Sequence, residues 1–148
     1  MGPLRHLTIV TAVMAAAALP SPAVAVAEPG GDATATPAIT TVPEVATPAG
    51  VTPFVDTPVL TESHPQHIDS WSRLPDGAAL AVQFTTGSAQ CYGVHAEVQE
   101  TADIVAVKLR SGTLPEAEGR ACMMIALFAT LPVPLQAPLG NRAVVSIT

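Results

Sequence analysis

The sequence predicts an all-β fold, namely a small antiparallel β-sandwich or partly open barrel of about five to seven strands. Beyond residue 60, short runs alternate between apolar and polar residues, which is the period of a half-buried strand. Turn-forming Gly, Pro, Asp and Asn residues separate these runs, and no convincing amphipathic helix is present. We therefore expect one β-domain at residues 60–148, after a signal segment at 1–27 and a disordered linker at 28–59.

Residues 1–27 have the order of a secretory signal peptide. Arg5 precedes residues 7–19, an uncharged run of thirteen small and apolar residues that is too short for a bilayer core needing about twenty. The small-residue pattern that ends at Ala27 predicts cleavage there, and a similar pattern ending at Ala25 is the alternative. Since no cysteine lies near the cleavage site to accept a lipid, we expect a secreted or envelope-associated protein without a lipid anchor.

Residues 28–59 consist mainly of Ala, Thr, Val, Pro and Gly, and six of them are prolines. Proline at this density removes backbone donors and favours extended, semi-rigid chain. The segment also lacks a period that would bury one face, so we expect a disordered linker without secondary structure. Its threonines are either O-glycosylated, as in Ser/Thr/Pro-rich stalks, or unmodified.

Three strands are expected from side chains that alternate with a period of two, at residues 79–86, 92–98 and 104–110. A Pro-Asp-Gly turn precedes the first of these strands. The short polar link at 99–103 is typical of a hairpin connection between the second and the third.

Two further strands are expected near the carboxyl end. Residues 122–131 are almost wholly apolar, which indicates a central strand buried on both faces, with a buried helix as the alternative because Met, Ala and Leu are good helix formers. We prefer the strand because Pro132 and Pro134 end the run. The last strand is expected at 143–147, after a turn at 138–141. Near the start of the domain, residues 68–71, with Ile68 and Trp71, are candidates for a further edge strand.

Cys91 and Cys122 are the only cysteines, so one intramolecular disulfide is possible. The predicted hairpin brings both to the same end of the sheet, because Cys91 opens the second strand and Cys122 opens the fourth. Closing a loop of about thirty residues would stabilise the fold by about 3–4 kcal/mol in an oxidising compartment. A redox pair or a thiolate metal site is less consistent with the sequence, which has no C-x-x-C spacing.

Several short motifs are similar to a pattern in uncharacterised exported proteins of high-GC Gram-positive bacteria. They lie between residues 80 and 146 and are Cys91-Tyr92-Gly93-Val94, Val98-Gln99-Glu100-Thr101, Val105-Ala106-Val107, Cys122-Met123-Met124-Ile125 and Pro138-Leu139-Gly140-Asn141-Arg142-Ala143-Val144-Val145. The resemblance implies an envelope or extracellular setting and brings no known activity. This chain departs from the lipoprotein version of the pattern by lacking the cysteine at the cleavage site.

The charge balance disfavours two classes of partner. The chain has six basic and twelve acidic residues, a formal net charge of −6, and loss of Arg5 with the signal segment leaves −7 (5 − 12). Nucleic acid and anionic lipid both require clustered Lys and Arg. We therefore expect no nucleic acid, no stable membrane insertion after signal cleavage and no cofactor; the expected partner is an unknown protein or envelope component.

A weak candidate metal site lies at His64, His67 and Asp69, to which His95 could add a ligand from a strand. Two imidazoles and a carboxylate suit zinc or copper. However, a proline follows His64, so the histidines do not share a helix face. Solvated polar residues at a domain edge are the preferred interpretation.

No catalytic group is predicted. Ser70 and Ser72 lie near His67 and Asp69, but the chain has no G-x-S-x-G nucleophile elbow. Carboxylates suitable for glycoside hydrolysis fall on an expected hairpin turn and loop, where solvation is the simpler explanation. They are Glu97, Glu100, Asp103, Glu116 and Glu118.

Three functional hypotheses follow. The first is a non-catalytic exported domain that binds another envelope or extracellular component. The second is a small secreted metal-binding protein or enzyme that uses His64, His67 and Asp69. The third is a secreted protease inhibitor, in which a disulfide-braced β-domain presents the exposed loop at 111–120.

Overall fold

The computed structural model describes residues 36–148. The predicted signal segment at 1–27, and residues 28–35 of the predicted linker, lie outside the described residues. The predicted all-β class is confirmed, because the described chain forms nine strands and one short 3₁₀ turn, η1 (Pro115–Ala117). The strands are β1 (Ile39–Thr41), β2 (Thr52–Pro53), β3 (Thr61–Pro65), β4 (Ser70–Arg73), β5 (Ala79–Thr86), β6 (Tyr92–Glu100), β7 (Ile104–Thr113), β8 (Leu127–Pro134) and β9 (Ala143–Ile147).

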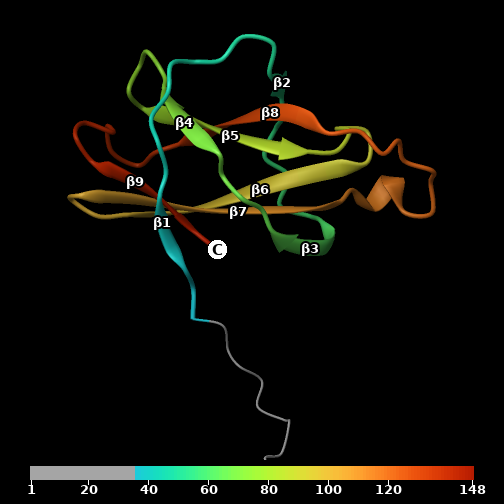
Figure 1. Cartoon of the computed structure of the whole chain (residues 1–148). Helices are drawn as coiled ribbons and strands as arrows, with labels where there is room; N and C mark the ends of the chain where they lie inside the picture. Colours follow the sequence, from blue (N-terminus) through green and yellow to red (C-terminus); the bar gives the residue numbers. More distant parts are fainter. Residues whose placement is uncertain (1–35) are drawn as a thin grey trace, which may run out of the picture. The chain divides into compact units, whose positions relative to one another are not determined.

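The strands form two sheets that lie one above the other (Figure 1). In the first sheet, β6 pairs along the whole of one edge of β7. The other edge of β7 is shared by β9, which is parallel to its first half, and β3, which is antiparallel to its second half. β1 extends this sheet beyond β9.

The second sheet has the order β2-β8-β5-β4. β5 and β8 are antiparallel over their full length, and β2 is parallel to β8 at the edge. Both sheets are therefore mixed rather than purely antiparallel, and the strands number nine because short pairings near the amino end add to those predicted.

Side chains from the facing sides of the sheets fill a single core. Phe84, Leu80 and Val82 of β5 are fully buried, and Leu109 of β7 lies among the same group. The rings of Phe54 and Phe84 meet edge to face, with centroids 5.8 Å apart. Since the core has few aromatic residues, it relies on close packing of Val and Leu between the two sheets.

The prediction of a disordered linker is wrong for residues 36–59. Val42 and Phe54 are buried in the core, and the indole N–H of Trp71 donates to the Val42 carbonyl at 3.1 Å. Between these anchors, residues 43–53 cross the outer side of the second sheet from β4 to β2 (Figure 1). Prolines are tolerated because each pairing is short and lies at a sheet edge. Since this segment packs into the core and pairs with the sheets, the domain extends at least to residue 36.

The predicted strand at 122–131 is displaced towards the carboxyl end. Residues 121–126 have no regular structure, and β8 continues through both prolines that were expected to end it. The Leu135 N–H donates to the Ala78 carbonyl, whereas the Thr130 carbonyl accepts from the Phe54 N–H on the opposite edge. The backbone nitrogens of Pro132 and Pro134 point to the same edge of β8 as the Thr130 carbonyl, at positions beyond the end of the short β2. Neither proline therefore removes a hydrogen bond that the sheet needs.

The other predicted elements differ little from the observed ones. The strands at 79–86 and 143–147 have the predicted bounds, and Trp71 lies in an edge strand, β4. β7 continues to Thr113, so the expected loop at 111–120 begins later than predicted and contains η1. Within residues 36–148, no helix is long and apolar enough to cross a membrane.

Candidate functional site: an apolar loop held by a disulfide

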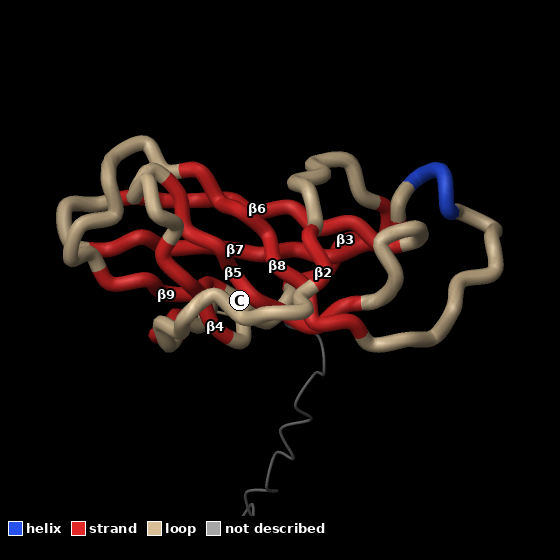
Figure 2. The backbone as a smooth tube through the Cα atoms, turned by 90° about the horizontal axis from the view of Figure 1, so that it is seen from above, coloured by secondary structure: helices blue, strands red, loops and turns tan. Residues whose placement is uncertain are grey.

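The segment at residues 118–126, hereafter the 118–126 loop, connects η1 to β8 at one end of the molecule. The tube in Figure 2 shows it extending beyond the ends of the strands, next to the single blue turn of η1. It contains Cys122 and the apolar run Met123-Met124-Ile125. Its position at the end of the domain makes it accessible from several directions.

The predicted disulfide is confirmed, and it holds the loop to the body of the domain. Cys91 and Cys122 are bonded, with their Cα atoms 6.1 Å apart. Cys91 is buried, its N–H donates to the Ser88 carbonyl, and its carbonyl accepts from the Leu114 N–H at 2.8 Å. Cys122 lies in the loop rather than at the start of a strand, so the bond anchors a segment that no strand pairing holds.

The apolar side chains of the loop face solvent. Met123 is 68% exposed, Met124 95% and Ile125 41%, and Ala126 is exposed as well. Four consecutive exposed apolar residues are unfavourable in a soluble protein unless they serve a contact. Met is also among the residues enriched at protein interfaces.

The backbone of the loop has a γ-turn centred on Met124. From Ala121 to Ala126 it makes no helix, β-turn or bend. The Ile125 N–H donates to the Met123 carbonyl at 3.0 Å, which restricts the conformation around Met124. One residue after Ala126, β8 begins and pairs with β5, so the segment is fixed at both ends.

Open hollows flank the loop. A hollow of about 460 Å³ is lined by Tyr92, Arg120 and Cys122, among others, and a second of about 400 Å³ is lined by Gly87, Tyr92 and the loop's Met and Ile residues. Tyr92 of β6 lines both hollows, so both lie between the loop and the body of the domain.

The structure does not bring the predicted metal ligands together. His67 Nε2 lies 3.8 Å from Asp69 Oδ1, with both side chains well exposed, whereas His64 makes a local contact with the Pro65 carbonyl. Among residues 36–148, no group of three or more His, Cys, Asp or Glu side chains is placed to hold a metal ion.

His95 pairs instead with Asp56. Its Nδ1 lies 3.0 Å from both carboxylate oxygens, and Asp56 Oδ1 also accepts from the Ala96 N–H at 2.8 Å. The sequence prediction missed this pair because Asp56 fell in the expected linker. Within the described chain no hydroxyl or thiol is hydrogen-bonded to His95, so the nucleophile of a catalytic triad has no counterpart there.

The candidate serine nucleophiles support a buried amide. Ser70 Oγ donates to Gln83 Oε1 at 3.1 Å, and Gln83 Nε2 donates to Ser72 Oγ at 2.8 Å. Gln83 lies on the outer face of β5, where residues 43–53 cover it. Gln83 is 5% exposed, and these hydrogen bonds satisfy its buried amide. The two serines therefore have a structural role.

A cavity of about 470 Å³ lies between residues 45–51 and the outer face of the second sheet. Its walls are mainly apolar, and Asp69, Ser70 and Gln83 supply its polar groups. Gln83 is bonded to the two serines, and Asp69 accepts from the Thr85 hydroxyl. Since these groups are engaged with the protein, few remain to orient a ligand.

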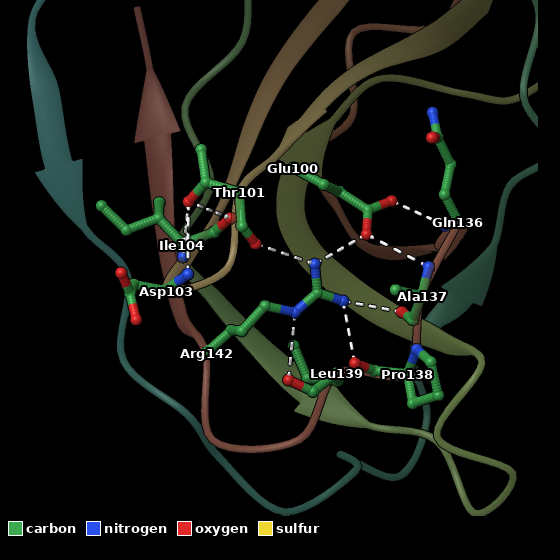
Figure 3. Close-up of polar contacts among 9 residues, drawn as sticks. All are labelled: Glu100, Thr101, Asp103, Ile104, Gln136, Ala137, Pro138, Leu139 and Arg142. Carbon is green, nitrogen blue, oxygen red and sulfur yellow. Dashed lines mark hydrogen bonds and ion pairs between the residues drawn. The ribbon is translucent and has the colours of Figure 1, made fainter.

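Two of the candidate carboxylates form ion pairs. Glu97 lies 3.7 Å from Lys108 on the neighbouring strand, an exposed contact of a common kind. Glu100 is 2.7 Å from Arg142 and accepts from the Gln136 and Ala137 N–H groups (Figure 3). The Gln136 hydrogen bond, together with the Arg142 guanidinium, lowers the pKa of Glu100. A carboxylate held in its charged form is poorly suited to act as a general acid.

The sequence matches no family model and no curated protein, and the structure matches no solved structure. Fold and site together define a small, disulfide-bonded all-β domain whose most distinctive surface is the exposed apolar 118–126 loop.

Proposed function

We propose that this chain is an exported, non-catalytic binding module that contacts a protein partner through the 118–126 loop. The observation that carries the proposal is the near-complete exposure of Met124, at 95%, in a segment that a disulfide holds to the domain. When a partner removes exposed apolar side chains from water, their burial contributes favourably to the free energy of binding. A segment already fixed at both ends loses little conformational entropy on binding.

Three features support an extracellular setting. The predicted signal segment is one, and the bonded pair Cys91–Cys122 is another, because disulfides persist in oxidising compartments. The resemblance to exported bacterial proteins is the third.

The charge of the domain favours a protein over other partners. Residues 121–126 carry no charge, and the acidic excess of the chain would repel nucleic acid and anionic lipid. An uncharged apolar tip, with Arg120 and Glu118 nearby, matches the usual arrangement of a protein interface, an apolar centre with a polar rim.

Site-specific photo-cross-linking tests the proposal. A photoreactive amino acid replaces Met124 in one variant and Val59 in a matched control, whose native side chain is 70% exposed elsewhere on the domain. In the producing organism we expect a discrete adduct from position 124 that excess unlabelled wild-type protein removes and excess Met124→Asp protein does not. Equal adducts at both positions, or none at position 124, would contradict the proposal.

A further inference from the structure

We infer that the partner surface is the substrate cleft of an endopeptidase with an apolar primary-specificity pocket, that Met124 fills this pocket, and that the chain is a protein inhibitor of such an enzyme. This inference rests on the proposed function and names its partner class. It also relocates the inhibitory segment from 111–120, as expected from the sequence, to 121–126.

The shape of the loop fits a protease cleft. Endopeptidases bind an extended segment along its backbone and choose the cleavage site with a pocket for one side chain. Residues 121–126 contain no helix, β-turn or bend, carry no charge and border the two hollows. The hydrogen bond from the Ile125 N–H to the Met123 carbonyl places Met124 at the centre of a γ-turn in this segment. The apolar specificity follows from Met124, which is unbranched and the most exposed of the three large apolar side chains.

The disulfide distinguishes an inhibitor from a substrate. Cys122, two residues before Met124, is bonded to the buried Cys91, and β8 begins at Leu127, three residues after it. Both sides of the Met124–Ile125 peptide bond are therefore attached to the same folded body. Cleavage would leave neither fragment free to diffuse out of the cleft.

The same attachment favours resynthesis of the bond. Hydrolysis of the Met124–Ile125 bond adds one water and gives a Met124 carboxylate and an Ile125 ammonium group. Because the domain holds these new ends close together, the reverse step, which expels that water, is intramolecular and has a high effective concentration. The intact and cleaved forms can then interconvert on the enzyme while the cleft stays occupied.

Exchange of the specificity residue provides the test. The full chain is assayed against chymotrypsin and subtilisin, which accept apolar side chains, and against trypsin, which requires a basic one. We expect the wild type to inhibit at least one of the first two and not trypsin. Met124→Lys should gain inhibition of trypsin and lose at least about 100-fold against the apolar-specific enzyme, because the pocket discriminates by side chain. Met123→Lys is the matched control and should gain no trypsin inhibition.

A second variant tests the role of the brace. Cys91→Ser with Cys122→Ser should convert the inhibitor into a substrate, with cleavage between Met124 and Ile125 detected by mass spectrometry. Circular dichroism establishes that the variant retains its β-structure.

The outcomes separate this inference from the proposed function. Rapid cleavage of the intact wild type at Met124, or trypsin inhibition absent from Met124→Lys, overturns the inhibitor inference. A cross-link from position 124 to a partner that is not a protease, removed by excess wild-type protein, would overturn the inhibitor inference and leave the proposed binding function intact. Flotation with phosphatidylcholine vesicles that depends on Met124 would assign the loop to lipid and overturn both.

Discussion

Arg142 and Glu100 link two segments at the end of the molecule opposite the disulfide. Arg142 Nη1 lies 2.7 Å from Glu100 Oε2, and the two side chains are only 9% and 10% exposed. The guanidinium also donates to the carbonyls of Ala137, Pro138 and Leu139 (Figure 3). One side chain therefore fixes the connection between β8 and β9 against the end of β6.

Removal of Arg142 should destabilise the domain markedly. Arg142→Ala leaves Glu100 with a charge that is poorly solvated and several carbonyls without their donor. We expect the free energy of unfolding to fall by about 1.5–3 kcal/mol, the range for hydrogen bonds to charged groups. Arg120→Ala is the control, because Arg120 is exposed and should change stability by less than about 0.5 kcal/mol. Equal effects of the two variants in urea denaturation would contradict this role.

Glu100 should make stability depend on pH in the acid range. Its pKa lies below the ordinary value of 4.5 in the folded protein, chiefly because the Gln136 N–H and the Arg142 guanidinium stabilise the carboxylate. A depressed pKa contributes stability that is present above the unfolded pKa and is lost as pH falls through the folded one. Glu100→Gln should therefore be less stable than the wild type at neutral pH, with a gap that narrows below pH 4.5. Denaturation curves at several pH values measure this gap; a gap constant into the acid range would refute the assignment.

The disulfide should contribute to stability as well as to the loop. Its residues are 31 positions apart. Cys91→Ser with Cys122→Ser should lower the free energy of unfolding by about 3–4 kcal/mol, if the bond acts mainly by restricting the unfolded chain. In the variant, limited proteolysis under native conditions should cut within residues 121–126 faster than in the wild type, while β5 stays intact. Unchanged cleavage of the loop would show that the bond does not hold it.

Phe54 tests whether the amino-terminal segment belongs to the domain. The side chain is 6% exposed and packs against Phe84, so Phe54→Ala should cost about 3–5 kcal/mol. The neighbouring Val55 is 78% exposed, and Val55→Ala should have little effect. If thermal denaturation showed the two variants to be equally stable, residues 36–59 would not be part of the cooperative fold.

Local sequence patterns predicted the strands whose neighbours are close in the chain. Period-two alternation located β5, and the polar link after Gln99 indicated the hairpin of β6 and β7, whereas β9 was located by the turn at 138–141 before it. Each of these strands could be located from its own residues, without knowledge of its distant partners. The cysteine pairing followed because there was one combination of two thiols.

The elements that were missed depend on distant partners. β1 and β2 are too short to show a period, and their order comes from pairing with β9 and β8 about 75–110 residues later. The apolar run after Cys122 lies in an exposed loop, and composition alone does not distinguish such a run from a buried strand. Asp56 and His95 were likewise separated by 39 positions.

Methionine oxidation tests the central claim most directly, namely that a partner covers the 118–126 loop. Beyond the predicted signal segment, Met123 and Met124 are the only methionines in the chain, so their oxidation reports on the loop alone. Dilute hydrogen peroxide is applied to the purified protein and to the protein in its native extracellular or envelope fraction, and sulfoxide is measured by mass spectrometry. We predict rapid oxidation of Met124 in the purified protein and strong protection in the native fraction. Equal rates in the two preparations would contradict the account.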